Sequence, residues 1–217
     1  MTRLPMPAPD DPIPVIAGWL AEVTASGKLR NGNAMALATA DAAGAPSVRM
    51  VLLKELAAEG YSVFYTNYGS RKSEEIGRNP RAAAVIYWEA LGRQVRFEGI
   101  VVRSPANESD AYFATRPLLS QLNAWSSAQS QPLRDPADLE RAAQHKAREL
   151  GITPRSGIGH VPRPEGWGGF RLWFDGIELW AEGENRFHER LYYRRTLEPL
   201  DAFAFRASPW NAERLQP

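Results

Sequence analysis

Apolar residues near the start of the chain recur with the spacing of an α-helix. They follow Asp11 and Pro12, a pair typical of a helix start, and they stop at Gly27, a residue common just after a helix end. The apolar positions are Val15, Ile16, Trp19, Leu20 and Val23. A spacing of three and four places them on one side of a helix, so the pattern predicts an amphipathic helix near residues 12–27.

Beyond residue 34 the pattern changes to short apolar or alternating runs that are typical of β-strands. A short helix is expected between Ser70 and Asn79, because serine is a common N-cap and Pro80 disfavours helix in the residue before it. Two further helices, near 105–116 and 136–150, each begin at a proline. The predicted strands up to the second helix cover residues 34–40, 47–55, 62–67, 82–89 and 94–103.

The C-terminal region 165–217 is also rich in strand signals. The dipeptide Asp175-Gly176 stands between two apolar runs, and Asp-Gly favours the positive φ angles of a type I′ turn. The sequence therefore predicts a tight β-hairpin at this dipeptide. Two more strands are expected at 190–195 and 203–206.

The order of these elements indicates the fold class. Strands follow one another with helices inserted between some of them, whereas a parallel doubly wound sheet alternates strands and helices strictly. A length of 217 residues fits one large unit. We expect a mainly β protein, an antiparallel barrel with peripheral helices, in which residues 1–217 form a single unit.

Composition and charge exclude several classes of function. The chain has 26 Lys and Arg against 25 Asp and Glu, so no field of one sign attracts nucleic acid or an anionic membrane. It has no cysteine, which excludes disulfides, thiolate metal sites and a cysteine nucleophile. No apolar run approaches the ~20 residues of a membrane span, and the N-terminal residues lack the apolar core of a signal peptide. We expect a cytoplasmic protein that binds no metal, nucleic acid or membrane.

The glycine loops that commonly hold phosphate are missing, because the chain contains neither a strand followed by G-x-G-x-x-G nor a G-x-x-x-x-G-K-[ST] motif. Any phosphate must therefore be held by side chains. Two groups of basic and hydroxyl residues offer this: one comprises Arg49, Lys54, Tyr65, Thr66, Ser70, Arg71 and Lys72, and the other comprises Tyr112, Arg116 and Ser120.

Both groups also have an ordinary structural interpretation. The first is equally typical of solvated surface charge. In the second, Tyr112 can be a core residue and Arg116 can cap a helix C-terminus. A third group, Arg186, His188 and Arg190, is predicted to alternate along one strand face near Trp180, as a surface stripe or as a face that contacts a ligand.

Several segments carry a resemblance to a known family. In chain order they are RMVLLK (49–54), VFYTNYGSRK (63–72), RQVRFEG (93–99), YFATRPLLSQLNAWSSAQS (112–130) and IELWAEGENRFHER (177–190). Together they resemble the pyridoxamine 5′-phosphate oxidases over roughly residues 34–130 and 165–217. The resemblance implies an FMN-binding split β-barrel that works as a homodimer with FMN at the interface. It implies oxidation of pyridoxamine 5′-phosphate or pyridoxine 5′-phosphate to pyridoxal 5′-phosphate, with dioxygen as acceptor and hydrogen peroxide as product.

The resemblance also implies roles for individual residues. FMN contacts are implied for Arg49, Met50, Val51, Leu52, Leu53, Lys54, Tyr65, Thr66, Arg71, Lys72, Gln94, Gln129, Ser130, Trp180 and Arg190. Contacts with the phosphate and ring of the substrate are implied for Lys54, Tyr112, Arg116, Ser120, Arg186 and His188. Of these, Arg186 and His188 are the catalytic candidates, because they would cover the substrate ring and stabilise charge as hydride leaves.

Some positions depart from the family pattern, namely Asn31, Leu118, Ala128 and the H-E-R at 188–190. Two alternatives therefore stay open. The first is a phenazine-biosynthesis-type FMN oxidase that acts on a non-phosphorylated aromatic substrate; such enzymes share H-E-R but typically lose the residues that bind the vitamer phosphate, which this chain keeps. The second is a flavin- or pyridoxal-phosphate-binding protein without catalytic activity.

Overall fold

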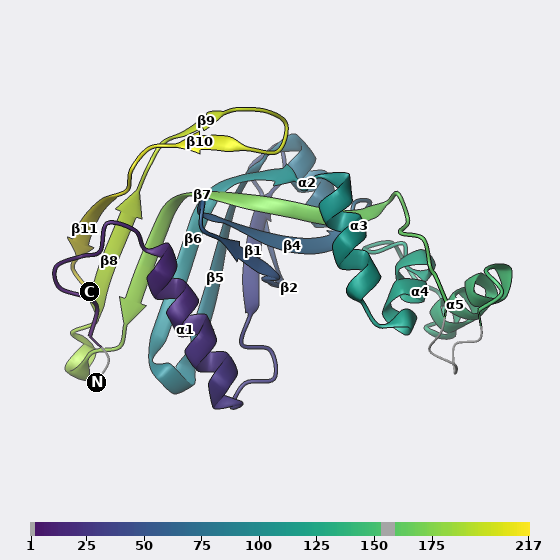
Figure 1. Ribbon diagram of the computed structural model, residues 1–217, viewed down its shortest axis with the longest axis horizontal. Coiled ribbons are helices and arrows are strands. Elements are labelled where there is room, and N and C mark those ends of the chain that lie inside the picture. Colours follow the sequence, from purple (N-terminus) through teal and green to yellow (C-terminus); the bar gives the residue numbers. More distant parts are fainter. Residues whose placement is uncertain (1–2, 153–158) are drawn as a thin grey trace.

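The computed structural model describes residues 3–152 and 159–217. Among these residues, nine strands form one antiparallel sheet, which bends into a half-barrel (Figure 1). They are β1 (Ala34–Ala40), β2 (Pro46–Leu52), β3 (Glu55–Ala57), β4 (Tyr61–Asn67), β5 (Arg81–Trp88), β6 (Arg93–Arg103), β7 (Trp167–Ala181), β8 (Glu189–Arg194) and β11 (Asn211–Leu215). The strand order β11-β8-β7-β6-β5-β1-β2 leaves β2 at one edge, while β4 pairs with β7 and with β3. The mainly β antiparallel fold predicted from the sequence is confirmed.

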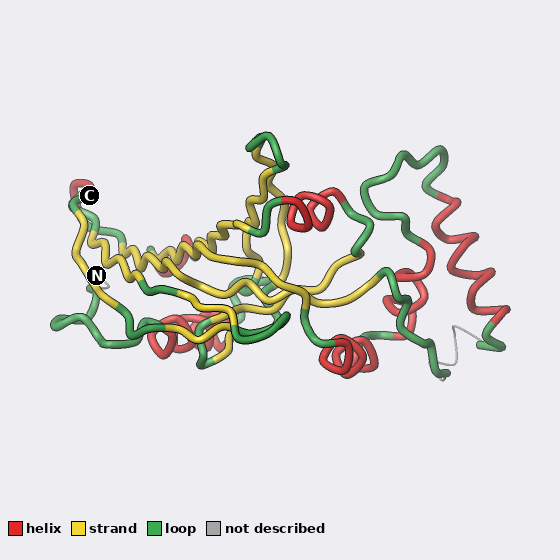
Figure 2. The backbone as a smooth tube through the Cα atoms, turned by 90° about the horizontal axis from the view of Figure 1, so that it is seen from above, coloured by secondary structure: helices red, strands yellow, loops and turns green. Residues whose placement is uncertain are grey.

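Helices cover the sheet and project from one end of it (Figures 1 and 2). The first helix packs Ile16, Trp19 and Val23 into the core of the half-barrel, where Trp19 meets the edge of Trp88 at 6.3 Å between ring centres. None of the helices in the described residues is long and apolar enough to cross a membrane. The helices are α1 (Ile13–Ser26), α2 (Arg71–Arg78), α3 (Ala106–Thr115), α4 (Leu118–Ser126) and α5 (Ala137–Glu149), with short 3₁₀ turns η1 (Glu89–Leu91) and η3 (Glu184–Arg186).

Helix α4 has no counterpart among the predicted elements. The sequence analysis took Arg116-Pro117 as a helix end, but Pro117 also begins the next helix. Its carbonyl accepts hydrogen bonds from the backbone N–H groups of Ser120 and Gln121 at 2.8 and 3.0 Å. Proline fits here because the first residues of a helix need no N–H partner within it. The helix matters for function because it forms one wall of the pocket described below.

The predicted hairpin at Asp175-Gly176 is wrong, because β7 runs without interruption through this dipeptide. On the neighbouring strand β6, Glu98 pairs with Gly176 while Gly99 pairs with Phe174, so Asp175 is the extra residue of a β-bulge. Strand pairing along both halves of β7 overrides the local turn preference of Asp-Gly. A single long strand therefore connects the two ends of the molecule.

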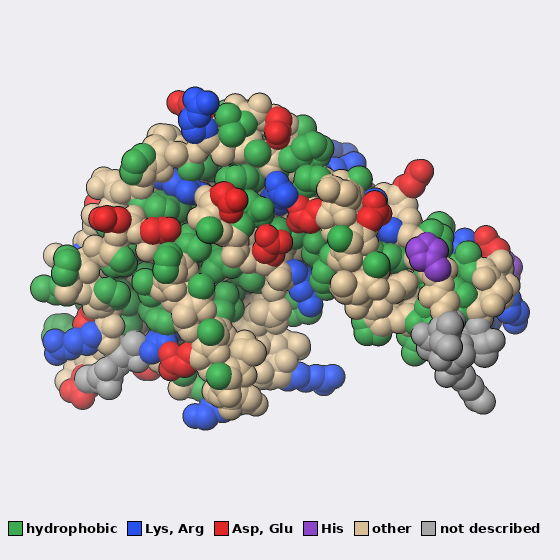
Figure 3. Space-filling view, in the orientation of Figure 1, with side chains coloured by type: hydrophobic (Ala, Val, Ile, Leu, Met, Phe, Trp, Pro, Cys, Tyr) green, Lys and Arg blue, Asp and Glu red, His purple; other side chains and the backbone are tan. Residues whose placement is uncertain are grey.

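The remaining strands form a small second sheet, β9 (Leu197–Pro199) with β10 (Phe205–Ala207). This two-stranded sheet lies over Tyr61 and Trp173 on the sheet beneath it. On the face shown in Figure 3, basic and acidic side chains are interspersed, and the surface is hollowed between the sheet and the projecting helices.

Candidate active site

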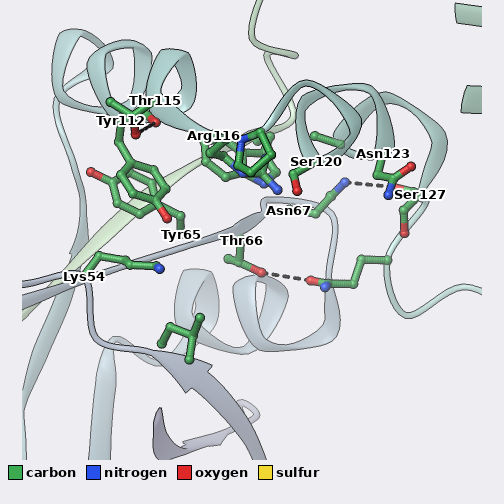
Figure 4. Close-up of a pocket in the computed structure, with 15 residues that line it drawn as sticks. Lys54, Tyr65, Thr66, Asn67, Tyr112, Thr115, Arg116, Ser120, Asn123 and Ser127 are labelled. Atoms are coloured by element: carbon green, nitrogen blue, oxygen red, sulfur yellow. Dashed lines mark hydrogen bonds between the residues drawn. The ribbon is translucent and has the colours of Figure 1, made fainter. Parts of the chain in front are cut away.

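A pocket of about 690 Å³ opens between β4 and the helices α3 and α4 (Figure 4). One wall is aromatic: the rings of Tyr65 and Tyr112 stack at 3.9 Å and 11°, and Trp167 lies nearly parallel to both. Burial raises the pKa of the Tyr65 hydroxyl, which stays neutral at physiological pH. The pocket thus offers a flat apolar wall to a planar ligand. Its lining residues are Leu52, Lys54, Tyr65, Thr66, Asn67, Tyr112, Thr115, Arg116, Pro117, Ser120, Asn123, Ala124, Ser127, Gln129 and Trp167.

Arg116 is the main cation of this pocket. Its guanidinium lies 4.6 Å from the centre of the Trp167 ring, and its Nη1 atom is buried without a hydrogen-bond partner among the described residues. Burial lowers the pKa of the guanidinium. A buried donor without a partner is unfavourable, so this geometry favours an anion at the site. Ser120, on the first turn of α4, lines the same pocket and is drawn next to Arg116 in Figure 4, and Lys54 Nζ lies 5.7 Å from the centre of the Tyr112 ring.

The end of α3 is capped by a different residue from the one considered in the sequence. The Gln121 side-chain amide donates to the carbonyl of Arg116 at 2.8 Å and to that of Ala114 at 3.4 Å. The Arg116 side chain instead turns toward the aromatic wall. No Asp or Glu is among the residues that line the described pocket, so the two cations dominate its electrostatics.

A second cationic group adjoins the pocket at the start of α2. Lys72 is 7% exposed, and its ammonium donates to the hydroxyls of Thr66 and Ser70 at 2.9 Å and to Gln129 Oε1 at 2.7 Å. Ser70 was predicted to cap this helix, but its hydroxyl contacts Lys72 and Ser73 instead of the helix backbone. Burial and, to a smaller extent, the nearby Arg49 lower the pKa of Lys72 to about 8. The group is a compact cradle of donors suited to a phosphate.

The loop after α4 closes this cradle. Thr66 donates to Gln129 Oε1 at 2.8 Å, and Ser130, which has a positive φ of 75°, accepts a hydrogen bond from the backbone N–H of Arg71 at 3.2 Å. Gln129 and Ser130, which come from a distant part of the sequence, thus lie beside the cationic residues with which the resemblance grouped them.

Arg49 and Arg71 meet at a residue that the sequence analysis missed. The carboxylate of Glu75 accepts from Arg71 Nε at 2.8 Å and from Arg49 Nη2 at 3.1 Å. Burial raises its pKa, but hydrogen bonds from two hydroxyls and the two guanidinium groups outweigh this and lower the pKa to about 2. The available signal was the i, i+4 spacing from Arg71 to Glu75, which is common on helix surfaces and does not indicate burial.

The segment from Met50 to Leu53 lies in the chain between Arg49, which contacts Glu75, and Lys54, which lines the pocket. Leu52 lines the pocket, Leu53 is buried, Val51 packs against the core, and Met50 is 63% exposed on the edge strand β2.

The third predicted group lies elsewhere. Gln94 on β6 pairs with Trp180 on β7, which pairs in turn with Arg190 on β8. The His188 ring lies 4.7 Å from that of Trp180. Arg190 is held by the buried carboxylate of Glu178, to which it donates at 2.8 and 2.9 Å.

The prediction that Arg186, His188 and Arg190 share one strand face is wrong. Arg186 lies in the 3₁₀ turn η3 with a φ of 67°, His188 precedes β8, and only Arg190 is in the strand. The chain must bend sharply here, because a Cβ on Gly183 would lie 1.8 Å from the carbonyl oxygen of Phe187.

Within one chain, the pocket and this third group are far apart. Tyr65 pairs with Gly169 near the start of β7, whereas Trp180 is near its end. The two positions are separated by about 36 Å of extended strand at roughly 3.3 Å per residue. A single chain therefore unites the first two groups and leaves the third apart.

Two models of known protein families match the chain. The family described as pyridoxamine 5′-phosphate oxidase matches residues 24–150, and the pyridoxine 5′-phosphate oxidase C-terminal dimerisation region matches residues 167–217. The chain belongs to the pyridoxamine 5′-phosphate oxidase family.

Relatives in this family match the chain over nearly its whole length. A pyridoxine/pyridoxamine 5′-phosphate oxidase of Cereibacter sphaeroides is 44% identical over 217 residues, which cover all of both chains. One from Rubrobacter xylanophilus is 47% identical over 210 residues, covering 97% of this chain and 88% of its own.

Among solved structures, PhzG from Burkholderia lata, determined in complex with tetrahydrophenazine-1-carboxylic acid, is 29% identical with a TM-score of 0.81 and covers 96% of this chain and 94% of its own. A pyridoxamine 5′-phosphate oxidase-related, FMN-binding protein of Nostoc punctiforme is 16% identical with a TM-score of 0.70, covering 95% of this chain and 98% of its own, and shares the fold.

Proposed function

We propose that this protein binds FMN and oxidises pyridoxamine 5′-phosphate or pyridoxine 5′-phosphate to pyridoxal 5′-phosphate, with dioxygen as acceptor and hydrogen peroxide as product. The observation that carries the proposal is the buried Nη1 of Arg116, which has no hydrogen-bond partner among the described residues and lies beside an aromatic wall, in a pocket that also adjoins the cradle around Lys72. Two cationic groups beside one pocket suit two phosphorylated aromatic molecules. The names of the relatives, at 44 and 47% identity, point to the same reaction.

The residues around Lys72 fit the phosphate of FMN. Three cations, Arg49, Arg71 and Lys72, lie with hydroxyl groups at the start of α2, where the helix dipole also favours negative charge. Gln129 Oε1 accepts hydrogen bonds from Thr66 and Lys72, two donors that could bind a phosphate oxygen instead. When bound, FMN would supply the redox chemistry of this reaction, a two-electron transfer from the substrate to dioxygen.

In this proposal the protein binds and orients the substrate. Arg116, Lys54 and Ser120 hold the substrate phosphate, while the ring lies along the wall formed by Tyr65 and Tyr112. Fixing the phosphate end sets the position of the reacting carbon, which converts a bimolecular encounter into an oriented one. The aromatic wall excludes water from one side of the ring.

We further propose a homodimer with FMN at the interface, in which Arg186 and His188 reach the substrate from the partner subunit. Their distance from the pocket within one chain supports this. A second observation that supports the dimer is an exposed face of the sheet. This exposed sheet face comprises Val48 and Met50 on β2, Tyr87 on β5 and the residues that pair with them. Val48 is 68% exposed, Met50 63% and Tyr87 53%. Cross-strand pairing places Gln94, Trp180 and Arg190 on the same face. An apolar face of this kind is typical of an interface.

The structural similarity to PhzG supports a second candidate function, in which the protein is an FMN oxidase of a non-phosphorylated aromatic acid. The two candidates differ in the anion that Arg116 binds. Oxygen consumption by the purified yellow protein should be measured with pyridoxine 5′-phosphate, with pyridoxine and with an aromatic carboxylic acid. Turnover that requires the phosphate supports the first function, and turnover of the carboxylic acid alone supports the second. A colourless protein that binds no added FMN would contradict both.

A further inference from the structure

Glu75 is a buried anion in the middle of a site that otherwise attracts anions. It is 5% exposed, and both of its carboxylate oxygens are occupied. Oε1 accepts from Arg71 Nε, and Oε2 accepts from the hydroxyls of Thr39 and Ser47 and from Arg49 Nη2. A carboxylate with so many charge-assisted bonds is fixed in place.

These bonds also fix the two guanidinium groups. Arg49 is on β2 and Arg71 begins α2, so Glu75 connects the sheet edge to the helix that carries Lys72. The bond to Arg71 uses Nε, and the Arg71 side chain is 65% exposed, so its terminal nitrogens are directed to the surface rather than into the carboxylate. Glu75 thus sets where these donors point.

The charges of the site are balanced for one particular ligand. Arg49, Arg71 and Lys72 carry three positive charges, and Glu75 reduces the net charge to two. A phosphate monoester carries between about −1.5 and −2 at neutral pH, so it matches the site with Glu75 included.

We propose that Glu75 is a positioning residue of the flavin phosphate site, where it holds the guanidinium groups of Arg49 and Arg71 in place beside the phosphate without touching the flavin itself. This inference rests on the proposed binding of FMN. A simple electrostatic view makes the opposite prediction for FMN affinity. In that view a carboxylate close to a phosphate repels it, so removal of Glu75 would strengthen FMN binding.

Flavin-free protein titrated with FMN and with riboflavin, followed by flavin fluorescence, separates the two views. Because riboflavin has no phosphate, it reports any general damage to the site. We expect Glu75→Ala to weaken FMN binding roughly tenfold or more, the effect of one lost charge-assisted hydrogen bond, and to change riboflavin binding less than about twofold. Glu75→Gln keeps one accepting oxygen and should recover part of the loss. Glu74→Gln is the matched control, since it removes the same charge from an exposed position on the same helix and should leave FMN binding as in the parent.

Equal or tighter FMN binding by Glu75→Ala, or parallel losses for FMN and riboflavin, would overturn the positioning role while leaving the proposed function intact. Failure of the parent protein itself to bind FMN would overturn both. If Glu75→Ala does not fold, Ser47→Ala makes the same comparison, because Ser47 contacts both Glu75 and Arg49. We then expect a loss of about threefold that is selective for FMN, and an unchanged ratio of FMN to riboflavin affinity would overturn the inference.

Discussion

The guanidinium of Arg116 rests on the indole of Trp167, 4.6 Å from the ring centre, and this contact joins the end of α3 to the first residue of β7. It holds a cation at the pocket wall, and the buried Nη1 atom has no hydrogen-bond partner within the part of the chain that the structure describes. Removal of the side chain should delete a charge-assisted interaction with the substrate phosphate, worth roughly 1.5–3 kcal/mol. We expect Arg116→Ala to bind pyridoxine 5′-phosphate ~10- to 150-fold more weakly, as measured by steady-state kinetics and direct titration.

The dephosphorylated vitamer provides the control for this variant. Pyridoxine has no phosphate to lose, so its weaker binding should respond little to Arg116→Ala. Flavin content should also match the parent, because Arg116 lies outside the cradle around Lys72. Unchanged binding of both vitamers would remove the phosphate-binding role of Arg116.

Lys72 should make FMN binding depend on pH. Burial and Arg49 lower the pKa of its ammonium from 10.5 to about 8, and a bound phosphate favours the charged form and raises the pKa again. Binding therefore takes up a proton as the pH rises through about 8, so FMN affinity should already be about twofold lower at pH 8 than at pH 7 and then fall by up to tenfold per unit. Titrations at several pH values test this, and Lys72→Met, which cannot titrate, should bind FMN weakly and lose this pH dependence.

The exposed sheet face gives a direct test of the proposed dimer. Val48 is 68% exposed in the single chain, so Val48→Glu should leave the fold of each subunit intact. Within the proposed apolar interface the buried charge would be strongly unfavourable. We expect this variant to sediment as a monomer at micromolar concentration and to lose FMN. Leu200→Glu is the matched control, since Leu200 is 56% exposed outside this face and its substitution should preserve the sedimentation of the parent.

Gly99 tests the bulge that replaces the predicted hairpin. A Cβ at this position would lie 1.8 Å from the carbonyl oxygen of Trp173, within the backbone of β7. Gly99→Ala should therefore destabilise the protein by about 3 kcal/mol or more, which corresponds to a fall in Tm of roughly 6–12 °C. In Gly18→Ala the new methyl group meets nothing within 4 Å on an exposed helix, and thermal unfolding should show equal or higher stability.

Local patterns were sufficient to predict most elements of the fold. Periodicity located α1, and proline located the starts of α3 and α5, because these signals lie within a few residues of the elements that they specify. The continuous course of β7 was missed because it depends on pairing with β6 and β4, which are distant in sequence. The 3₁₀ turn at Arg186 was missed because it is set by the close approach of Gly183 to Phe187.

The candidate site shows the same division. Basic residues beside hydroxyls indicated two anion sites, since charge and residue type can be read from the sequence directly. Trp167 and Glu75 could not be found in this way, because a tryptophan at a strand start and a glutamate in a charged helix are ordinary until the fold buries them beside Arg116 and Arg49. The resemblance supplied Gln129 and Ser130, which no local pattern had singled out.

The length of β7 implies that two different variants of this protein can complement each other. In the proposed dimer, each active site combines the Arg116 end of one subunit with the Arg186 end of the other. Arg116→Ala and Arg186→Ala, each assayed at a substrate concentration too low for either variant to turn over measurably, would then complement each other when their subunits are mixed and reassociated. One site of the mixed dimer would carry both substitutions and the other would carry neither, so about a quarter of the parent activity should return from statistical exchange. A protein in which every site is built within one chain would show no such recovery.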